Sequence, residues 1–157
     1  MTQTFAESVT PRRGLKGSVT QPGDGYVLDT ASRAGVVVVP AAEGHCDLPA
    51  SAADVAKAIG VLAYDPVAEV TGSTNDFDAD AAVEVVDAGT IWCVDEAGLS
   101  VGDQPYARYA SGTGTVIGAL YDGADTATCA LLPNSRVVAV TTGLAKIKVN
   151  LPYGAAA

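Results

Sequence analysis

Short apolar runs separated by glycine, proline and polar turns recur along most of the chain. In residues 145–151 apolar and polar residues alternate strictly, with Ile147 and Val149 on the apolar side. Such alternation is typical of a strand that has one face in a core and the other in water. Four consecutive valines at 36–39 predict a strand that is buried on both faces. Both patterns favour a β-protein.

Further strands are expected at residues 26–28, 60–64, 83–86, 90–94, 105–109, 112–121, 127–132 and 136–140. Asp122-Gly123 is a hairpin-type turn signal between two of them. Eight or so short strands, roughly 8–12 residues apart with turn signals between them, are typical of a sandwich or barrel. The sequence predicts an all-β, single-domain, antiparallel β-sandwich or jelly-roll-like barrel over residues 26–157.

One short helix is expected, at residues 49–60. Ser51 can cap its first turn, Asp54 follows three residues later as in a capping box, and Gly60 can end it. Residues 1–25 hold two prolines and four glycines and lack a sustained period. We therefore expect these residues to form an extended N-terminal arm that is ordered against a neighbour.

Residues 89–109 contain the only tryptophan, Trp92, and two of the six tyrosines. The strand pattern around Trp92 predicts that it anchors the core, together with Tyr106. With Ile147 and Val149, these residues make up the predicted structural core. A turn at residues 101–103 is expected to fix the register between the flanking strands.

The net charge of −9 is unevenly spread. Residues 43–125 hold fifteen acidic and two basic residues, whereas residues 126–157 hold three basic and no acidic ones. An acidic body would be repelled by phosphates, which argues against direct nucleic-acid binding. Basic ends favour contacts with an acidic partner. Arg12, Arg13 and Lys16 are the candidate partner-binding residues.

Little in the sequence points to catalysis. The only histidine lies in His45-Cys46-Asp47, without partners at ligand spacing, so this triplet is interpreted as a loop cluster and not a metal site. A single histidine also removes most catalytic-triad and acid–base arrangements. We expect no enzyme activity and no cofactor or metal. The longest apolar runs, of which 36–39 is one, hold four residues and are too short to span a membrane.

The spacing of Asp76, Asp78 and Asp80 is that of a calcium loop. The sixth position of that loop is Ala81, where the motif needs glycine, and the twelfth is Asp87, where it needs glutamate. A solvated acidic loop is the favoured interpretation, and a weak cation site stays open. The three cysteines, at 46, 93 and 129, lack paired spacing and are expected to be reduced, buried residues.

Four segments together carry a family resemblance: G-T-I-W-C-V-D-E-A at 89–97, V-G-D-Q-P-Y-A-R-Y at 101–109, L-P-N-S-R-V-V at 132–138, and G-L-A-K-I-K-V-N-L at 143–151. Their order resembles the structural cement proteins of tailed bacteriophage heads. Residues 60–65 are similar to a further segment of that family. The chain departs from the family pattern at Cys93, Pro105, Ala107 and Val138.

The resemblance implies a non-catalytic decoration protein on the outer surface of the capsid, made in the host cytoplasm. It would bind the major capsid protein, bridge neighbouring subunits and stabilise the expanded shell. A homodimer or homotrimer on local symmetry axes would fit such a role. Two other classes stay open: a β-sandwich receptor- or glycan-binding module, and a small β-barrel hydrolase built around His45.

Overall fold

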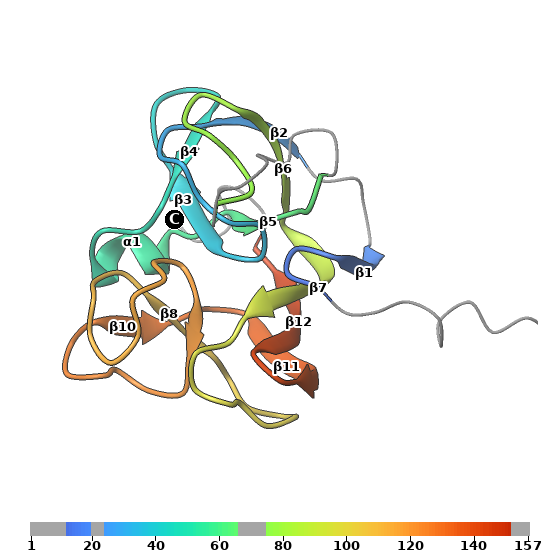
Figure 1. Ribbon diagram of the computed structural model, residues 1–157, viewed down its shortest axis with the longest axis vertical. Helices are drawn as coiled ribbons and strands as arrows, with labels where there is room; N and C mark the ends of the chain where they lie inside the picture. Colours follow the sequence, from blue (N-terminus) through green and yellow to red (C-terminus); the bar gives the residue numbers. More distant parts are fainter. Residues whose placement is uncertain (1–11, 20–23, 66–74, 152–157) are drawn as a thin grey trace, which may run out of the picture.

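Strands dominate the computed structural model, which describes residues 12–19, 24–65 and 75–151 (Figure 1). The elements within these ranges are β1 (Lys16–Val19), β2 (Asp24–Leu28), β3 (Val37–Pro40), β4 (His45–Asp47), α1 (Ala52–Ala56), β5 (Gly60–Leu62), β6 (Ala82–Val86), β7 (Ala88–Val94), β8 (Tyr106–Arg108), β9 (Leu120–Tyr121), β10 (Cys129–Leu131), β11 (Ser135–Thr141) and β12 (Leu144–Asn150). The prediction of an all-β fold with one short helix is confirmed.

The strands form one closed barrel and two open sheets. The barrel has the order β2-β4-β3-β5-β6, and its β2–β4 pair is parallel while the others are antiparallel. A four-stranded sheet has the order β1-β7-β12-β11, and a three-stranded sheet the order β10-β8-β9. In Figure 1 the barrel lies at the top, the two sheets lie below it, and α1 lies at the left between them.

Two hydrophobic cores share one wall of strands. The first fills the barrel and includes Val38 of β3 and Val36, which directly precedes that strand. The second lies between the open sheets and includes Val37 of the same strand, with Ile91 of β7 and Ile147 of β12. Because successive side chains of a strand point to opposite faces, β3 contributes to both cores. The run of valines is therefore buried on both faces, as the sequence predicted.

Helix α1 is shorter than the predicted 49–60 but starts as expected. The Ser51 hydroxyl accepts a hydrogen bond from the Asp54 backbone N–H at 3.2 Å, and Asp54 Oδ2 accepts one from the Ala50 N–H at 2.9 Å. These bonds satisfy amide groups that have no partner within the helix. Gly60 then begins β5, where a strand was expected.

The prediction of a strand over residues 112–121 is wrong except for β9, which holds only Leu120 and Tyr121. The predicted hairpin at Asp122-Gly123 is also wrong, because β8 lies between β9 and β10. In residues 112–116, contacts with acidic side chains take the place of backbone hydrogen bonds between strands. A Cβ on Gly112 would meet the Asp125 carboxylate, and one on Gly114 would collide with the Glu96 carboxylate. The glycines let this segment wrap around acidic groups.

The prediction that Trp92 anchors the core is wrong. In β7, Ile91 and Cys93 are buried in the core, and Trp92 between them is half-buried on the opposite, outer face. Side chains alternate between the two faces of a strand. Because Ile91 and Cys93 lie on the core face, Trp92 between them must lie on the other face. Tyr106 is also only half-buried. Ile147 and Val149 are buried, as predicted.

The sequence missed two strands, β1 and β4. Residues 16–19 of the predicted arm form β1, which pairs antiparallel with β7, while residues 1–11 and 20–23 lie outside the described residues. Residues 45–47, interpreted as a loop, form β4, whose central Cys46 is buried in the barrel. All three cysteines are free and buried, as expected. Among the described residues, no helix has the length and apolar character needed to cross a membrane.

Candidate functional site

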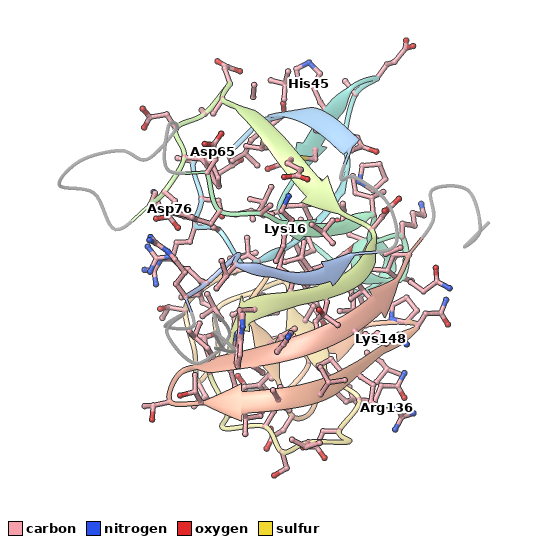
Figure 2. All side chains as sticks on the ribbon, turned by 90° about the vertical axis from the view of Figure 1, so that its right-hand side faces the viewer. Lys16, His45, Asp65, Asp76, Arg136 and Lys148 are labelled. Carbon is pink, nitrogen blue, oxygen red and sulfur yellow. The ribbon has the colours of Figure 1, made fainter. Side chains whose placement is uncertain are left out.

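The outer face of the four-stranded sheet combines basic, aromatic and aliphatic side chains and holds no acidic residue. We term it the β7–β12 face. Its members are Thr90, Trp92 and Val94 of β7, Leu144, Lys146, Lys148 and Asn150 of β12, and Arg136 and Val138 of the neighbouring β11. Figure 2 looks onto this sheet, with β11, β12, β7 and β1 stacked from the bottom upward.

The register of β7 and β12 sets the order of side chains along the face. Trp92 lies directly opposite Lys146, and Thr90 lies opposite Lys148. Such cross-strand neighbours are about 5 Å apart at Cβ, so Lys146 and Trp92 are direct neighbours on this face. A Cβ on Gly17 would collide with Thr90 Oγ1 and with the end of the Lys146 side chain. The glycine therefore lets Lys146 lie across β1.

A shallow groove of about 450 Å³ lies at one end of the face, where Lys148 and Asn150 of β12 meet Arg136 and Val138 of β11. Arg136 Nη1 donates to the Gly102 carbonyl at 2.9 Å, which holds the side chain over the edge of the sheet. Val138 is 40% exposed although it is a large aliphatic residue. A β-bulge between residues 137 and 139 places it there. The groove thus offers both charge and apolar surface.

A second concavity, of about 430 Å³, lies at the opposite end of the face. We term it the arginine hollow; it is lined by Arg12, Arg13, Arg33, Asp76, Val94, Gly143 and Leu144. In Figure 2 nitrogen-tipped side chains gather beside Asp76 at the left, while Arg136 and Lys148 lie at the right. Six of the nine Lys and Arg residues thus lie on the face or at its two ends.

The predicted partner-binding residues have different surroundings. Arg13 forms a two-pronged ion pair with Asp76, from Nε to Oδ2 at 2.7 Å and from Nη2 to Oδ1 at 3.0 Å. Lys16 pairs with Glu84 of the barrel at 2.9 Å, in an exposed position where such pairs contribute little stability. Arg12 stacks on the Tyr64 ring. The structure therefore brings Arg12 and Arg13 together and places Lys16 elsewhere.

The sequence did not single out Arg33, Arg136, Lys146 or Lys148 as binding residues. The signal for the last two was present, since they occupy the polar positions of the alternating strand and residues 126–157 contain no acid. Arg33 carried no such signal. It lines the hollow, and the backbone of the neighbouring Ala34 donates a hydrogen bond at 2.8 Å to Asp76, which lies 42 residues after Ala34.

A buried arginine holds the loops beside the three-stranded sheet. Arg108 is fully buried, and its Nε donates to Glu96 Oε1 at 2.8 Å while its Nη1 donates to Asp125 Oδ2 at 2.9 Å. The hydroxyl of Thr113, with further hydrogen bonds that include one from Arg108, lowers the pKa of Asp125 from 3.8 to about 2. Both carboxylates thus act as acceptors for a buried cation, which is a structural arrangement.

His45, Cys46 and Asp47 do not converge on one point. Alternation along β4 buries Cys46 and leaves its two neighbours half-exposed. His45 Nδ1 lies 2.6 Å from Asp29 Oδ1. Burial, followed by the charges of Asp29 and Asp47, raises the pKa of the Cys46 thiol to about 12. The thiol is therefore protonated at neutral pH and a poor nucleophile.

The chain's sequence matches, over residues 4–150, the family described as structural cement protein (E217 gp24/Pam3 gp6). It belongs to this family. The resemblance predicted from the sequence is thereby confirmed, and with it a structural, capsid-associated role. Among curated proteins, none matches the chain.

The fold of this cement-family chain is also found in a solved capsid structure. A chain of the structure titled "The capsid of Myoviridae Phage XM1" is similar to it with a TM-score of 0.64 and 17% sequence identity. The similarity covers 94% of this chain and 98% of that one. At this identity the comparison establishes a shared fold over almost the whole length.

The acidic loop of this cement-family chain is divided by the structure. Asp76 is 4% exposed and committed to Arg13 and the Ala34 N–H, whereas Asp78 and Asp80 are exposed. The three carboxylates therefore do not face a common point. Within the described ranges, no three His, Cys, Asp or Glu side chains are arranged to hold a metal ion.

Proposed function

We propose that this chain binds the outer surface of a phage head through its β7–β12 face, contacts neighbouring major capsid proteins and stabilises the expanded shell. One observation carries the proposal: a chain of net charge −9 has one sheet face without any acidic residue. Segregated charge of this kind steers association with an acidic partner surface and sets its orientation.

The two concave ends of the face support a bridging role. On β12, Leu144 lines the arginine hollow and Lys148 and Asn150 line the basic groove, so these lining residues lie roughly 14 to 20 Å apart at about 3.4 Å per residue. Each end has its own set of cationic and apolar side chains. Contacts at both ends with different capsid subunits would add through effective concentration, so individually modest contacts give firm binding.

Stabilisation of the shell follows from mass action. A protein that binds the expanded lattice and not its precursor shifts the equilibrium toward the expanded lattice. A second copy of the chain on a local symmetry axis, as a dimer or trimer, would raise the number of capsid contacts further. Synthesis in the host cytoplasm and addition to the outside of the head complete the proposal.

Heads that lack the protein provide the test. Purified chain is added to such heads, and occupancy is measured for wild type and for the double variant Lys146→Glu/Lys148→Glu. Reversing two charges at a contact with an acidic surface should weaken binding by more than about tenfold. Lys57→Glu, at the C-cap of α1 and away from the face, is the matched control and should bind like wild type.

Heads filled with the wild-type chain should also release DNA at a higher temperature than heads without it. Equal release temperatures would refute the stabilising role. If the double variant binds as tightly as the control, another surface faces the capsid. Binding of free chain to host cells or glycans, without binding to heads, would support the receptor-binding alternative instead.

A further inference from the structure

We propose that Arg12 and Arg33 form a carboxylate-binding site in the arginine hollow, which takes an Asp or Glu side chain from an exposed segment of a partner protein. The hollow is a concavity of about 430 Å³ whose lining includes three arginines and one aspartate. This inference rests on the proposed function only for the identity of the partner protein, because carboxylate binding is a property of the free chain.

Charge balance leaves two of the three arginines available. The Asp76 carboxylate accepts two N–H groups of Arg13 and the backbone N–H of Ala34, at 2.7 to 3.0 Å. The single negative charge of Asp76 is thereby paired with Arg13. Among the described residues, neither Arg12 nor Arg33 has an acidic partner. The hollow therefore keeps an excess of positive charge.

Arg12 is held in place without losing its charge. Its Cζ lies 3.4 Å from the centre of the Tyr64 ring, a stacking contact. Stacking covers one face of the guanidinium and leaves the N–H groups at its edge able to donate. Those N–H groups match the two oxygens of a carboxylate. Less side-chain freedom is lost on binding when the donor is already positioned.

The backbone on both sides of Arg33 is fixed as well. The Ser32 N–H donates to the Phe77 carbonyl at 3.1 Å, and the Ser32 carbonyl accepts from the N–H groups of residues 76 and 77 at 3.0 and 2.9 Å. On the other side, the Ala34 N–H donates to Asp76. Arg33 thus lies on a segment whose backbone is fixed by hydrogen bonds, and it lines the same hollow as Arg12.

The lining of the hollow favours a side-chain carboxylate over a polyanion. Val94 and Leu144, an opposed pair on β7 and β12, supply apolar surface for the methylene groups of an acidic side chain. Partial exclusion of water strengthens the ion pair above them. A nucleic acid would bring an extended row of phosphates toward a chain of net charge −9, which repels it.

The site is tested on the full-length free chain by following the arginine Nε–H signals in NMR titrations. The probes are the capped peptide Gly-Glu-Gly, its Gly-Gln-Gly counterpart and inorganic phosphate. We expect saturable shifts of Arg12 and Arg33 with the Glu peptide, and none with the Gln peptide. Arg33→Gln should weaken Glu-peptide binding about tenfold or more, while Lys57→Gln should leave it unchanged.

Three outcomes overturn the inference: the Glu and Gln peptides shift the same signals equally, Lys57→Gln weakens binding as much as Arg33→Gln, or phosphate binds more tightly than the peptide. The head-binding assay separates this inference from the proposed function. Suppose that the wild-type chain binds heads, that Lys146→Glu/Lys148→Glu weakens this binding, and that the wild-type chain does not bind the Glu peptide. The carboxylate site is then refuted and the capsid role stands.

Discussion

The Arg108 guanidinium lies 2.8 Å from Glu96 and has no exposure to solvent. On its other side it reaches Asp125 at 2.9 Å, while its Nη2 has no hydrogen-bond partner among the described atoms. A charge in this position is stable only because two carboxylates surround it. The same contacts tie β8, which carries Arg108, to the loops that follow β7 and β9, so this arginine organises one end of the fold.

Arg108→Met should therefore destabilise the protein strongly. Glu96 and Asp125 would be left almost buried without a cation, at a cost of about 3–5 kcal/mol. Urea denaturation measures the change in the free energy of unfolding. Lys57→Met, at an exposed position, should change it by no more than about 0.5 kcal/mol. Equal stability of the two variants would show that the buried ion pairs contribute nothing.

Stability should depend on pH through Asp125. Hydrogen bonds, the Thr113 hydroxyl foremost, hold its pKa at about 2 in the folded protein, below the ordinary 3.8. The contribution of Asp125 is thus complete above about pH 4 and is lost as the pH falls toward 2. Unfolding free energies measured from pH 2 to 5 should fall less steeply for Asp125→Asn. The exposed neighbour variant Asp122→Asn should keep the wild-type slope.

The two faces of β7 should respond differently to truncation. Ile91→Ala empties part of the core and should cost about 2–5 kcal/mol. Trp92→Ala removes a half-buried ring from the outer face and should cost less than about 1.5 kcal/mol. Denaturation curves of both variants give the comparison. A larger loss in the free energy of unfolding for Trp92→Ala than for Ile91→Ala would show that the tryptophan is part of the core.

Gly118 and Gly123 form a matched pair for a backbone test. Gly118 has a φ of +86°, and a Cβ there would lie 2.7 Å from the Val37 carbonyl, whereas a Cβ on Gly123 would meet nothing within 4 Å. Gly118→Ala should therefore cost about 1–3 kcal/mol. Gly123→Ala should be neutral or slightly stabilising. A thermal melt of each variant decides, and similar melting temperatures would contradict the strained geometry.

Local patterns in the sequence predicted local structure well. Strict alternation identified β12, the run of valines identified a strand buried on both faces, and Ser51 with Asp54 identified the start of the helix. Each of these depends on residues a few positions apart, where backbone geometry alone relates them. The order of strands in the small sheet was beyond such reasoning, because β8 separates β9 from β10 only in space.

The candidate site was predicted in part, for the same reason. Basic ends were evident in the sequence, and Arg12 does line the hollow. Arg13 instead forms an ion pair with Asp76, 63 residues away, and Lys16 forms one with Glu84, 68 residues away. A sequence does not show which distant carboxylate neutralises a given cation. Arg33 entered the site through the same long-range packing.

The alternation of β3 between the two cores has a mechanical consequence. Val37 cannot leave one core without pulling Val36 and Val38 out of the other, so the barrel and the open sheets cannot come apart one at a time. A load applied to the sheet would pass through this strand into the barrel instead of being absorbed at a hinge. We therefore expect the two cores to melt together in a single cooperative step.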